Sequence, residues 1–241
     1  MAGDLADLSA GAPEPIRSRM ALALDVDDLV EARRIARLLR PWFGVAKVGL
    51  ELFSAAGPQA IEAMISEGFD VFADLKLLDI PTTVNKAAYV MGSLGVTYLT
   101  VHSRAGVDHL RAGVDGVAAG AATAGLGAPL CLGITVLTSE RADLVALEER
   151  VGVVLAAGCG GLVCSASDLS LVRSVAPNVV AVVPGIRPAG VGVNDQARPA
   201  TPTLAIESGA DVLVIGRAVT HAEDPVMAAI AIATEVAGAV H

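Results

Sequence analysis

Two acids and a lysine interrupt an otherwise apolar segment at residues 72–81 of the sequence. Charges inside an apolar strand are costly unless they pair with each other or take part in chemistry. Asp74 and Lys76 are two residues apart, so on a β-strand they point to the same face and could contact one substrate atom from two sides. Asp79 must lie in the following loop, because Pro81 ends a regular strand. From this loop Asp79 would either fold back or reach a neighbouring chain. For the D-x-K motif itself, the alternative to a catalytic role is a structural ion pair at the end of a buried strand.

Polar side chains also stand at the ends of other apolar runs. Asp25 closes the first run, Lys47 stands near the end of the second, and His102 closes the fourth. Thr138 and Ser139 follow the fifth run. In parallel α/β barrels, chemistry takes place at the carboxyl ends of the strands. We therefore expect the first three strand ends to bring two carboxylates and two ammonium groups into one site, whereas a histidine in this position is more often packed and hydrogen-bonded.

Short apolar runs alternate with longer segments of helical periodicity. The expected strands are residues 20–25, 45–48, 71–76, 97–102, 130–136, 161–164, 179–183 and 212–215. The expected helices lie near residues 29–39, 58–67, 83–94, 107–119, 142–156, 169–175, 203–208 and 218–236. This alternation indicates a parallel sheet covered by helices, and eight units match a closed (β/α)8 TIM barrel of the α/β class. An open doubly wound sheet is the alternative, because sequence alone cannot show closure.

The size and composition of the chain suit one large core. It has 241 residues, of which 54% are hydrophobic, and no Pro- or Gly-rich linker divides it. We expect a single (β/α)8 barrel domain at residues 20–241. Residues 1–19 contain no long apolar stretch and are expected to form a flexible N-terminal extension. The Gly-rich stretch at residues 113–127 is interpreted as a small-residue helix with a turn.

Charge and cysteine content exclude several classes of protein. The formal net charge of −9 argues against non-specific binding to nucleic acids or anionic membranes, since both need a basic surface. Cys131, Cys159 and Cys164 lie in apolar runs and match no zinc or disulfide spacing. We expect buried free thiols in a reducing compartment, hence a cytoplasmic protein, and no metal site. An anionic ligand must then be held by a few local cations.

The seventh and eighth units have the features of an anion-binding site. Gly216 and Arg217 follow the eighth run, where a glycine lets the backbone approach a ligand and the next helix offers its first amides. Phosphate binding after strands seven and eight is common in such barrels. The connection at residues 184–201 is long for a compact domain and is interpreted as a lid that carries Arg187 and Gln196 to the phosphate. The alternative is a surface loop with a solvated arginine.

Taken together, these segments resemble the orotidine 5′-phosphate decarboxylase family. The resemblance covers nearly the whole chain after the first twenty residues. Its motifs stand in the family's order and are A-L-D at 23–25, K-V-G at 47–49, F-A-D-L-K-L-L-D-I-P-T-T-V at 72–84, T-V-L-T-S at 135–139, P-G-I-R-P at 184–188, Gln196 and I-G-R at 215–217. The D-x-K-x-x-D pattern alone is shared with sugar-phosphate enzymes of a wider superfamily. Four further features restrict the resemblance to the decarboxylase family, namely D-I-P-x-T, Lys47, P-G-I-R-P and Gln196.

The resemblance implies a lyase that needs neither metal nor cofactor. Such an enzyme converts orotidine 5′-monophosphate to uridine 5′-monophosphate and CO2 in de novo pyrimidine biosynthesis. The resemblance implies that Lys76 protonates the C6 carbanion and that Asp74 lies beside the substrate carboxylate. Lys47 and Asp25 would hold ribose hydroxyls and complete an alternating network of charges. Asp79 belongs to the implied catalytic set with Lys76, Asp74 and Lys47.

The other implied contacts involve a second subunit and the two ends of the nucleotide. In the homodimer that the resemblance implies, Asp79, Ile80 and Thr83 would enter the active site of the partner subunit. The pyrimidine edge would meet Thr138 and Ser139. The phosphate would be held by groups from the last two units, namely Arg187, Gln196, Gly216 and Arg217.

Two other functions compete with this interpretation. A Mg²⁺-dependent sugar-phosphate decarboxylase or aldolase of the same superfamily would have an acid where Lys47 stands. A non-catalytic phosphosugar-binding barrel would keep Gly216 and Arg217 but would have no need for Asp74 beside Lys76.

Overall fold

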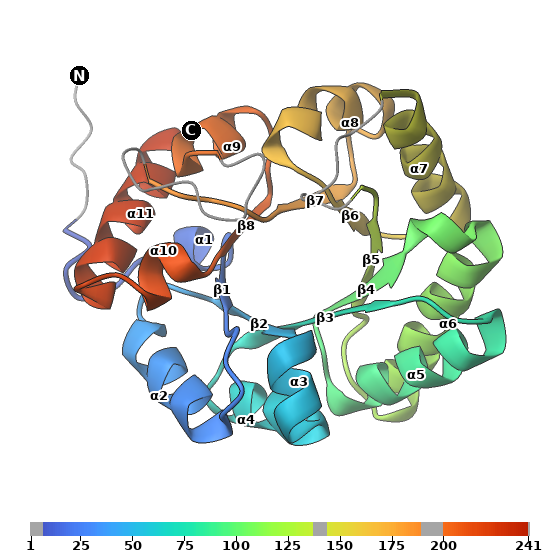
Figure 1. The fold of residues 1–241 in the computed structure, drawn as a ribbon, viewed down its shortest axis with the longest axis horizontal. Helices are drawn as coiled ribbons and strands as arrows, with labels where there is room; N and C mark the ends of the chain where they lie inside the picture. The colour runs from blue at the N-terminus through green and yellow to red at the C-terminus, as the bar shows by residue number, and fades with distance from the viewer. Residues whose placement is uncertain (1–6, 137–143, 189–199, 241) are drawn as a thin grey trace.

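Eight parallel strands close into a barrel and pair in chain order (Figure 1). The computed structural model describes residues 7–136, 144–188 and 200–240. The strands are β1 (Met20–Ala23), β2 (Val45–Gly49), β3 (Asp70–Leu77), β4 (Tyr98–His102), β5 (Leu130–Ile134), β6 (Gly161–Val163), β7 (Val180–Val183) and β8 (Val212–Ile215). The barrel closes where Met20 of β1 pairs with Leu213 of β8. The predicted (β/α)8 barrel is therefore confirmed, and an open sheet is excluded.

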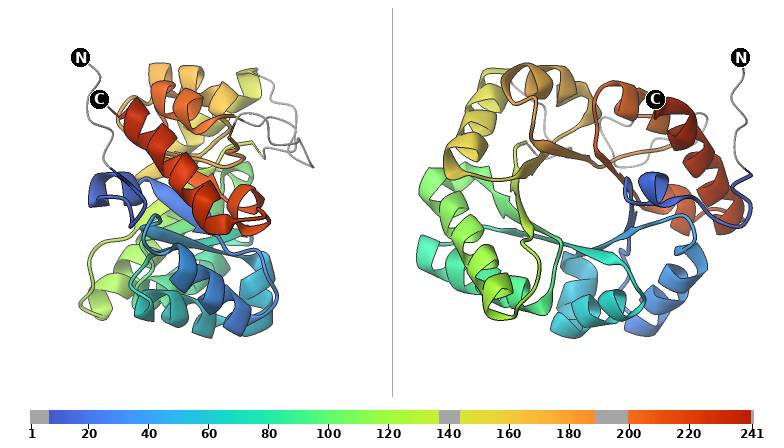
Figure 2. Two further views of the ribbon diagram at one scale, coloured as in Figure 1. Left: turned by 90° about the vertical axis from the view of Figure 1, so that its left-hand side faces the viewer. Right: turned by 180° about the vertical axis from the view of Figure 1, so that it is seen from behind.

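Helices surround the barrel on its outer side, except for α1, which lies at the N-terminal end of the barrel (Figures 1 and 2). They are α1 (Glu14–Arg17), α2 (Leu29–Leu39), α3 (Leu50–Ala56), α4 (Pro58–Ser66), α5 (Pro81–Leu94), α6 (Val107–Thr123), α7 (Leu144–Ala157), α8 (Leu169–Val175), α9 (Pro202–Glu207), α10 (Arg217–Thr220) and α11 (Pro225–Ala239). Sequence periodicity did not reveal α1 and α3. The helix expected at residues 218–236 is divided into α10 and α11, because the Asp224 carboxylate caps a new helix by accepting hydrogen bonds from the amides of Val226 and Met227.

Strand side chains alternate between the barrel interior and the helix layer. The interior cluster consists of Ala21, Ala23, Val45, Phe72, Leu132, Val182, Val212 and Val214. Phe72 and Tyr98 meet edge to face inside the barrel, with ring centroids 6.0 Å apart. A larger apolar cluster lies between the strands and the helices. The interior rows continue from Val45 to Lys47 and from Phe72 to Asp74, so charged groups occupy the carboxyl end of the barrel.

The N-terminal segment lies against the barrel, and its helix α1 lies at the end of the barrel where the strands begin (dark blue in the right-hand view of Figure 2). Leu8 and Ile16 are buried in the apolar core. The indole Nε1 of Trp42 donates a 2.8 Å hydrogen bond to the Leu8 carbonyl, and the Gly44 amide donates to the Arg17 carbonyl. The prediction of a flexible extension is therefore wrong for residues 8–19, because buried apolar side chains and hydrogen bonds anchor them.

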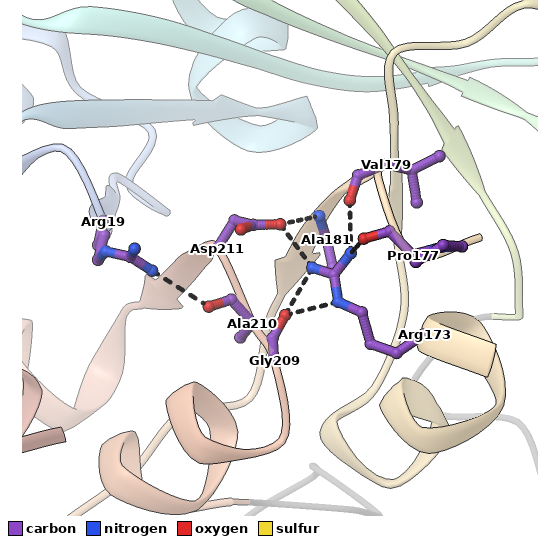
Figure 3. A network of polar contacts seen from close by, with 8 residues as sticks. All are labelled: Arg19, Arg173, Pro177, Val179, Ala181, Gly209, Ala210 and Asp211. Carbon is purple, nitrogen blue, oxygen red and sulfur yellow. Dashed lines mark hydrogen bonds and ion pairs between the residues drawn. The ribbon is translucent and has the colours of Figure 1, made fainter. Parts of the chain in front are cut away.

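Arg173 of α8 ties β7 to β8 at the N-terminal end of the barrel (Figure 3). Its guanidinium donates to the Gly209 carbonyl at 2.6 and 3.0 Å and to the Val179 carbonyl at 2.7 Å. It also pairs at 2.6 Å with Asp211 Oδ2, which accepts the backbone amide of Ala181. In such barrels this end serves stability, which leaves the opposite end for chemistry.

The cysteines agree with the expectation of buried free thiols, since all three are free and buried. A hydrogen bond with Cys159 raises the pKa of the Cys131 thiol, and burial raises it further. Within the residues that the structure describes, no helix is both long and apolar enough to cross a membrane.

Helices α5 and α6 approach each other through glycines. Gly116 and Gly120 of α6 face the carbonyl oxygens of Asn85 and Tyr89 on α5, and neither position has room for a Cβ. Gly92 of α5 is packed against α6 in the same way. The Gly-rich stretch therefore forms a helix followed by a turn, as predicted. Its small residues fix α5, which begins directly after the loop that leaves β3.

We expect Gly120→Ala to destabilise the protein, because the added Cβ would overlap the Tyr89 carbonyl oxygen and force α5 away from α6. Overpacking of this kind costs about 1–3 kcal/mol. Gly152→Ala on α7 is the matched control: no atom lies within 4 Å of its added Cβ, and alanine is favoured over glycine in a helix by about 1 kcal/mol. Thermal unfolding at one protein concentration compares the two variants. Equal midpoints would contradict this account of the helix pair.

Candidate active site

A pocket of about 240 Å³ opens at the carboxyl ends of the strands. Its polar lining consists of Asp25, Lys47, Asp74, Lys76, Gly185, Arg187, Gly216 and Arg217. Its apolar lining consists of Ala23, Phe72, Ile134, Val136, Val163, Pro184, Ile186, Val214 and Ala218. A ligand in this pocket would therefore meet acids and lysines from the first three strands, two arginines from the last two units, and a set of apolar side chains.

The acids and lysines form a chain of alternating charge. Lys47 Nζ lies 2.9 Å from Asp25 Oδ1 and 3.8 Å from Asp74 Oδ2. The same Asp74 oxygen lies 2.6 Å from Lys76 Nζ. The structure thus brings together the four side chains that the strand ends predicted, and each lysine has at least one carboxylate beside it.

Burial differs between the middle and the ends of this chain. The side chains of Lys47 and Asp74 are 10% and 12% exposed, whereas those of Asp25 and Lys76 are 52% and 35% exposed. Unpaired ions would be costly at the two enclosed positions, where the pairing with each other and with the outer groups offsets burial. Gly49 leaves the space for this arrangement, since a Cβ there would lie 2.9 Å from Lys47 Nζ. The two outer groups are accessible to a ligand.

The end of β3 is not a regular strand. Its register against β4 shifts between Ala73 and Leu77. Lys76 has a φ of 49°, the only positive value at a non-glycine residue in the described parts of the chain. The expectation that Asp74 and Lys76 reach one site holds, but an irregular backbone and not simple alternation directs the lysine. Such a left-handed conformation is strained, and strain of this kind concentrates at functional sites.

Three of the predicted anion-binding groups, Arg187, Gly216 and Arg217, line this pocket. Gly216 is the residue before α10, which begins at Arg217. Gly185 has a φ of 82°, a left-handed conformation that favours glycine, and it turns the chain toward Arg187. Arg187 is only 7% exposed, and its backbone amide donates to the Ala200 carbonyl at 2.9 Å, which joins the two ends of the connection between β7 and α9.

Three predicted residues do not line the pocket of their own chain. Asp79, Ile80 and Thr83 are exposed, in the β3–α5 loop and the first turn of α5. Asp79 Oδ1 accepts a 2.6 Å hydrogen bond from the Ile80 amide. Ile80 is 64% exposed and Leu78 is 52% exposed, so this segment presents apolar surface to solvent.

Other predicted residues lie outside the described parts of the chain. They are Thr138, Ser139 and Gln196, together with residues 189–199 of the predicted lid. His102 is buried at the end of β4, where its Nδ1 accepts a 3.2 Å hydrogen bond from the Arg104 amide, as expected for a packed imidazole.

The sequence interpretation missed the apolar lining and one polar contact. Phe72, Val163 and Val214 occupy interior positions, and strand alternation was the signal that could have assigned them to the pocket. Thr100 of β4 contacts both Asp74 and Lys76. Its only signal was a hydroxyl at an interior position of the strand next to the charged one.

Comparison with known proteins gives one consistent family. A family model described as Orotidine 5'-phosphate decarboxylase / HUMPS family matches residues 18–232. The orotidine 5'-phosphate decarboxylase of Anaeromyxobacter sp. (strain K) is 44% identical over 228 residues, which cover 89% of this chain and 96% of that protein. The orotidine 5'-phosphate decarboxylase of Moorella thermoacetica is 42% identical over 233 residues, which cover 91% and 92% respectively.

Solved structures share the fold over the same extent. The crystal structure of orotidine 5'-phosphate decarboxylase from Lactobacillus acidophilus superposes with a TM-score of 0.75 at 32% identity, covering 90% of this chain and 98% of that one. An uncharacterized conserved protein from Geobacillus kaustophilus gives a TM-score of 0.77 at 28% identity and covers 90% and 99%. The similarity therefore includes the whole barrel.

Proposed function

The chain belongs to the Orotidine 5'-phosphate decarboxylase / HUMPS family, and from this membership we propose that it converts orotidine 5′-monophosphate to uridine 5′-monophosphate and CO2 in pyrimidine biosynthesis. One observation carries the proposal. The Lys76 ammonium lies 2.6 Å from the Asp74 carboxylate in the pocket and keeps about a third of its side chain exposed. This pair supplies a proton donor and a fixed negative charge at one place.

The reaction needs a cation beside the carbon that loses CO2. When the bond from C6 to the carboxylate breaks, its electron pair stays on C6 in the plane of the pyrimidine ring. The ring carbonyls cannot delocalise that pair as they would in an enolate, so the protein must stabilise the charge directly. An ammonium group beside C6 does so and then transfers its proton to the carbon. We assign this role to Lys76.

Asp74 acts on the carboxylate that leaves. Its negative charge repels the substrate carboxylate but not neutral CO2, so the repulsion is relieved as the bond breaks. Asp74 is enclosed and held by Lys76 and Lys47, and it could turn away only by losing these partners. Enzymes lower barriers by about 8–23 kcal/mol, and one ion pair supplies only part of this. Contacts with remote parts of the substrate must therefore hold the reacting carbon in place.

The remaining groups of the pocket suit the rest of the nucleotide. Asp25 and Lys47 would bind ribose hydroxyls, since Asp25 remains accessible beside the paired lysine. Arg187 and Arg217, with the backbone of Gly216, would bind the phosphate through charge-assisted hydrogen bonds. These arginines provide local positive charge in a chain whose net charge is −9. Family resemblance adds Thr138 and Ser139 at the pyrimidine edge and Gln196 at the phosphate.

We assign Asp79, Ile80 and Thr83 to the pocket of a second copy of the chain. All three are exposed and lie outside the pocket of their own chain. Ile80 and the neighbouring Leu78 expose apolar surface, which is typical of a protein interface when it is contiguous. A twofold arrangement would carry each segment to the partner's pocket. The proposed enzyme is thus a homodimer with shared active sites.

Lys47 favours this reaction over a metal-dependent one. Its ammonium lies 2.9 Å from Asp25 and 3.8 Å from Asp74, in the place where a cation bridging these acids would sit. Mg²⁺ prefers carboxylate oxygens, but here the ammonium of a lysine already occupies the position between the two acids. A barrel that only bound phosphosugars would gain nothing from enclosing Asp74 between two lysines, because burying ions is costly.

Lys76→Ala should lower the turnover of orotidine 5′-monophosphate by at least about 10⁴-fold, because charge stabilisation and protonation at C6 are both lost. Binding of uridine 5′-monophosphate should persist, since the phosphate and ribose contacts remain. Lys86→Ala is the matched control: Lys86 is exposed on α5 and is the one lysine outside the pocket. Pyrimidine absorbance measures turnover and calorimetry measures binding. Near-normal turnover in Lys76→Ala would refute the assignment.

Removal of metal ions should leave the activity unchanged, because Lys47 and Lys76 provide the positive charge at the acids. The protein is dialysed against EDTA and assayed with orotidine 5′-monophosphate before and after addition of Mg²⁺. Loss of activity that Mg²⁺ restores would contradict the metal-free mechanism proposed for this site.

Mixed dimers should show that Asp79 works in the partner's site. Lys76→Ala and Asp79→Ala dimers should each be strongly impaired. Co-expression of the two chains should restore about a quarter of the wild-type activity, since half of the twofold dimers would then contain one complete site. Two differently tagged Lys76→Ala chains serve as the control and should remain inactive. If purified mixed dimers show no recovery, the shared site is wrong.

A further inference from the structure

The irregular end of β3 leaves one residue of β4 opposite three residues of the charged segment. Ala73 pairs with Leu99, and pairing resumes only at Leu77. Thr100 therefore stands alone opposite residues 74–76, where the regular ladder between the two strands is interrupted. Buried backbone amides are rarely left without a partner, so the interrupted segment needs one from elsewhere.

The hydroxyl of Thr100 provides that partner and a second contact. Its Oγ1 accepts a 2.8 Å hydrogen bond from the backbone amide of Lys76 and donates a 3.1 Å hydrogen bond to Asp74 Oδ1. The other oxygen of Asp74, Oδ2, is the one that contacts the ammonium groups of Lys47 and Lys76. Thr100 is 0% exposed, so bulk water cannot replace its hydroxyl. One oxygen atom thus holds the carboxylate from one side and the lysine backbone from the other.

Lys76 needs this support because its backbone is unfavourable. With a φ of 49° it has a left-handed conformation, which a residue with a Cβ keeps only when its surroundings impose it. Without the hydrogen bond to its amide, the segment could relax toward an extended conformation. Relaxation at this residue would change the direction in which the side chain leaves the strand and move the ammonium away from Asp74.

We propose that Thr100 is a positioning residue for the decarboxylation. It holds the Lys76 ammonium and the Asp74 carboxylate in the geometry in which one protonates C6 and the other faces the leaving carboxylate. The inference rests on the proposed function. Thr100 does not line the pocket, so it acts through these two groups and not on the substrate itself.

The hydroxyl can be separated from the shape of the side chain by substitution. Thr100→Val keeps the volume and removes both hydrogen bonds, whereas Thr100→Ser keeps the hydroxyl and removes a methyl group. Thr97→Val is the matched control. Thr97 Oγ1 donates a 3.2 Å hydrogen bond to Asp70 Oδ1, so it joins the same two strands by the same kind of contact, but at the opposite end of the barrel.

Steady-state kinetics with orotidine 5′-monophosphate and calorimetry with uridine 5′-monophosphate test the proposal. Thr100→Val should lower kcat at least about tenfold, while KM and the Kd of the product stay within about threefold, because the lost interaction affects only the reacting groups. Thr100→Ser and Thr97→Val should stay within about threefold of the wild type in kcat. Should Thr100→Val fail to fold, Thr100→Ala takes its place, since it differs from Thr100→Ser by the single oxygen atom.

The outcomes separate this inference from the function on which it rests. A wild-type kcat in folded Thr100→Val or Thr100→Ala would overturn the positioning role and leave the decarboxylase proposal standing. An equal loss in Thr100→Ser and Thr100→Val would also overturn it, because the effect would then follow packing and not the hydroxyl. A wild-type chain that releases no CO2 from orotidine 5′-monophosphate would overturn both proposals.

Discussion

This structure depends on one constraint, which is that two ammonium groups and two carboxylates lie side by side at the end of a barrel. Lys47 and Asp74 are enclosed, and each is tolerable there only because the other groups of the chain of charges surround it. Three adjacent parallel strands deliver the groups, since β1, β2 and β3 end at the same edge. The apolar layer between strands and helices holds these strands in register. A shift of one strand would therefore leave buried charge unpaired.

Most of the fold could be predicted because its signals are local. The alternation of apolar runs with segments of helical periodicity predicted the position of all eight strands to within a few residues. It also predicted the bounds of α2 and α8 without error. Two features were not visible in that way. Helix α3 is short and follows β2 directly, so it resembles a loop in sequence. The anchoring of Leu8 depends on Trp42 and the barrel end, which is a tertiary contact that no local pattern in residues 1–19 encodes.

The charged part of the site was predictable from residue type and strand position, whereas its fine geometry was not. Asp25, Lys47, Asp74 and Lys76 stand out because ionisable groups are rare at the ends of apolar runs. A threonine in a strand is ordinary, because β-branched residues favour strands, so Thr100 gave no comparable signal. The register shift opposite it is a property of two paired strands. Neither strand alone contains the information that Lys76 adopts a left-handed backbone.

The charge balance of the pocket links stability to the proposed chemistry. The formal charges of two acids and two lysines balance, so these four groups add no net charge to the pocket before a ligand binds. A substrate carboxylate placed beside Asp74 adds one negative charge, and Lys76 is the adjacent accessible cation that can offset it. Once neutral CO2 departs, the carbanion takes the place of the carboxylate as the second anion beside the ammonium. On a mobile backbone the lysine could move with Asp74 and away from C6. In the proposed reaction, proton delivery to C6 would therefore depend on the strained backbone of Lys76 and on the hydrogen bond that supports it.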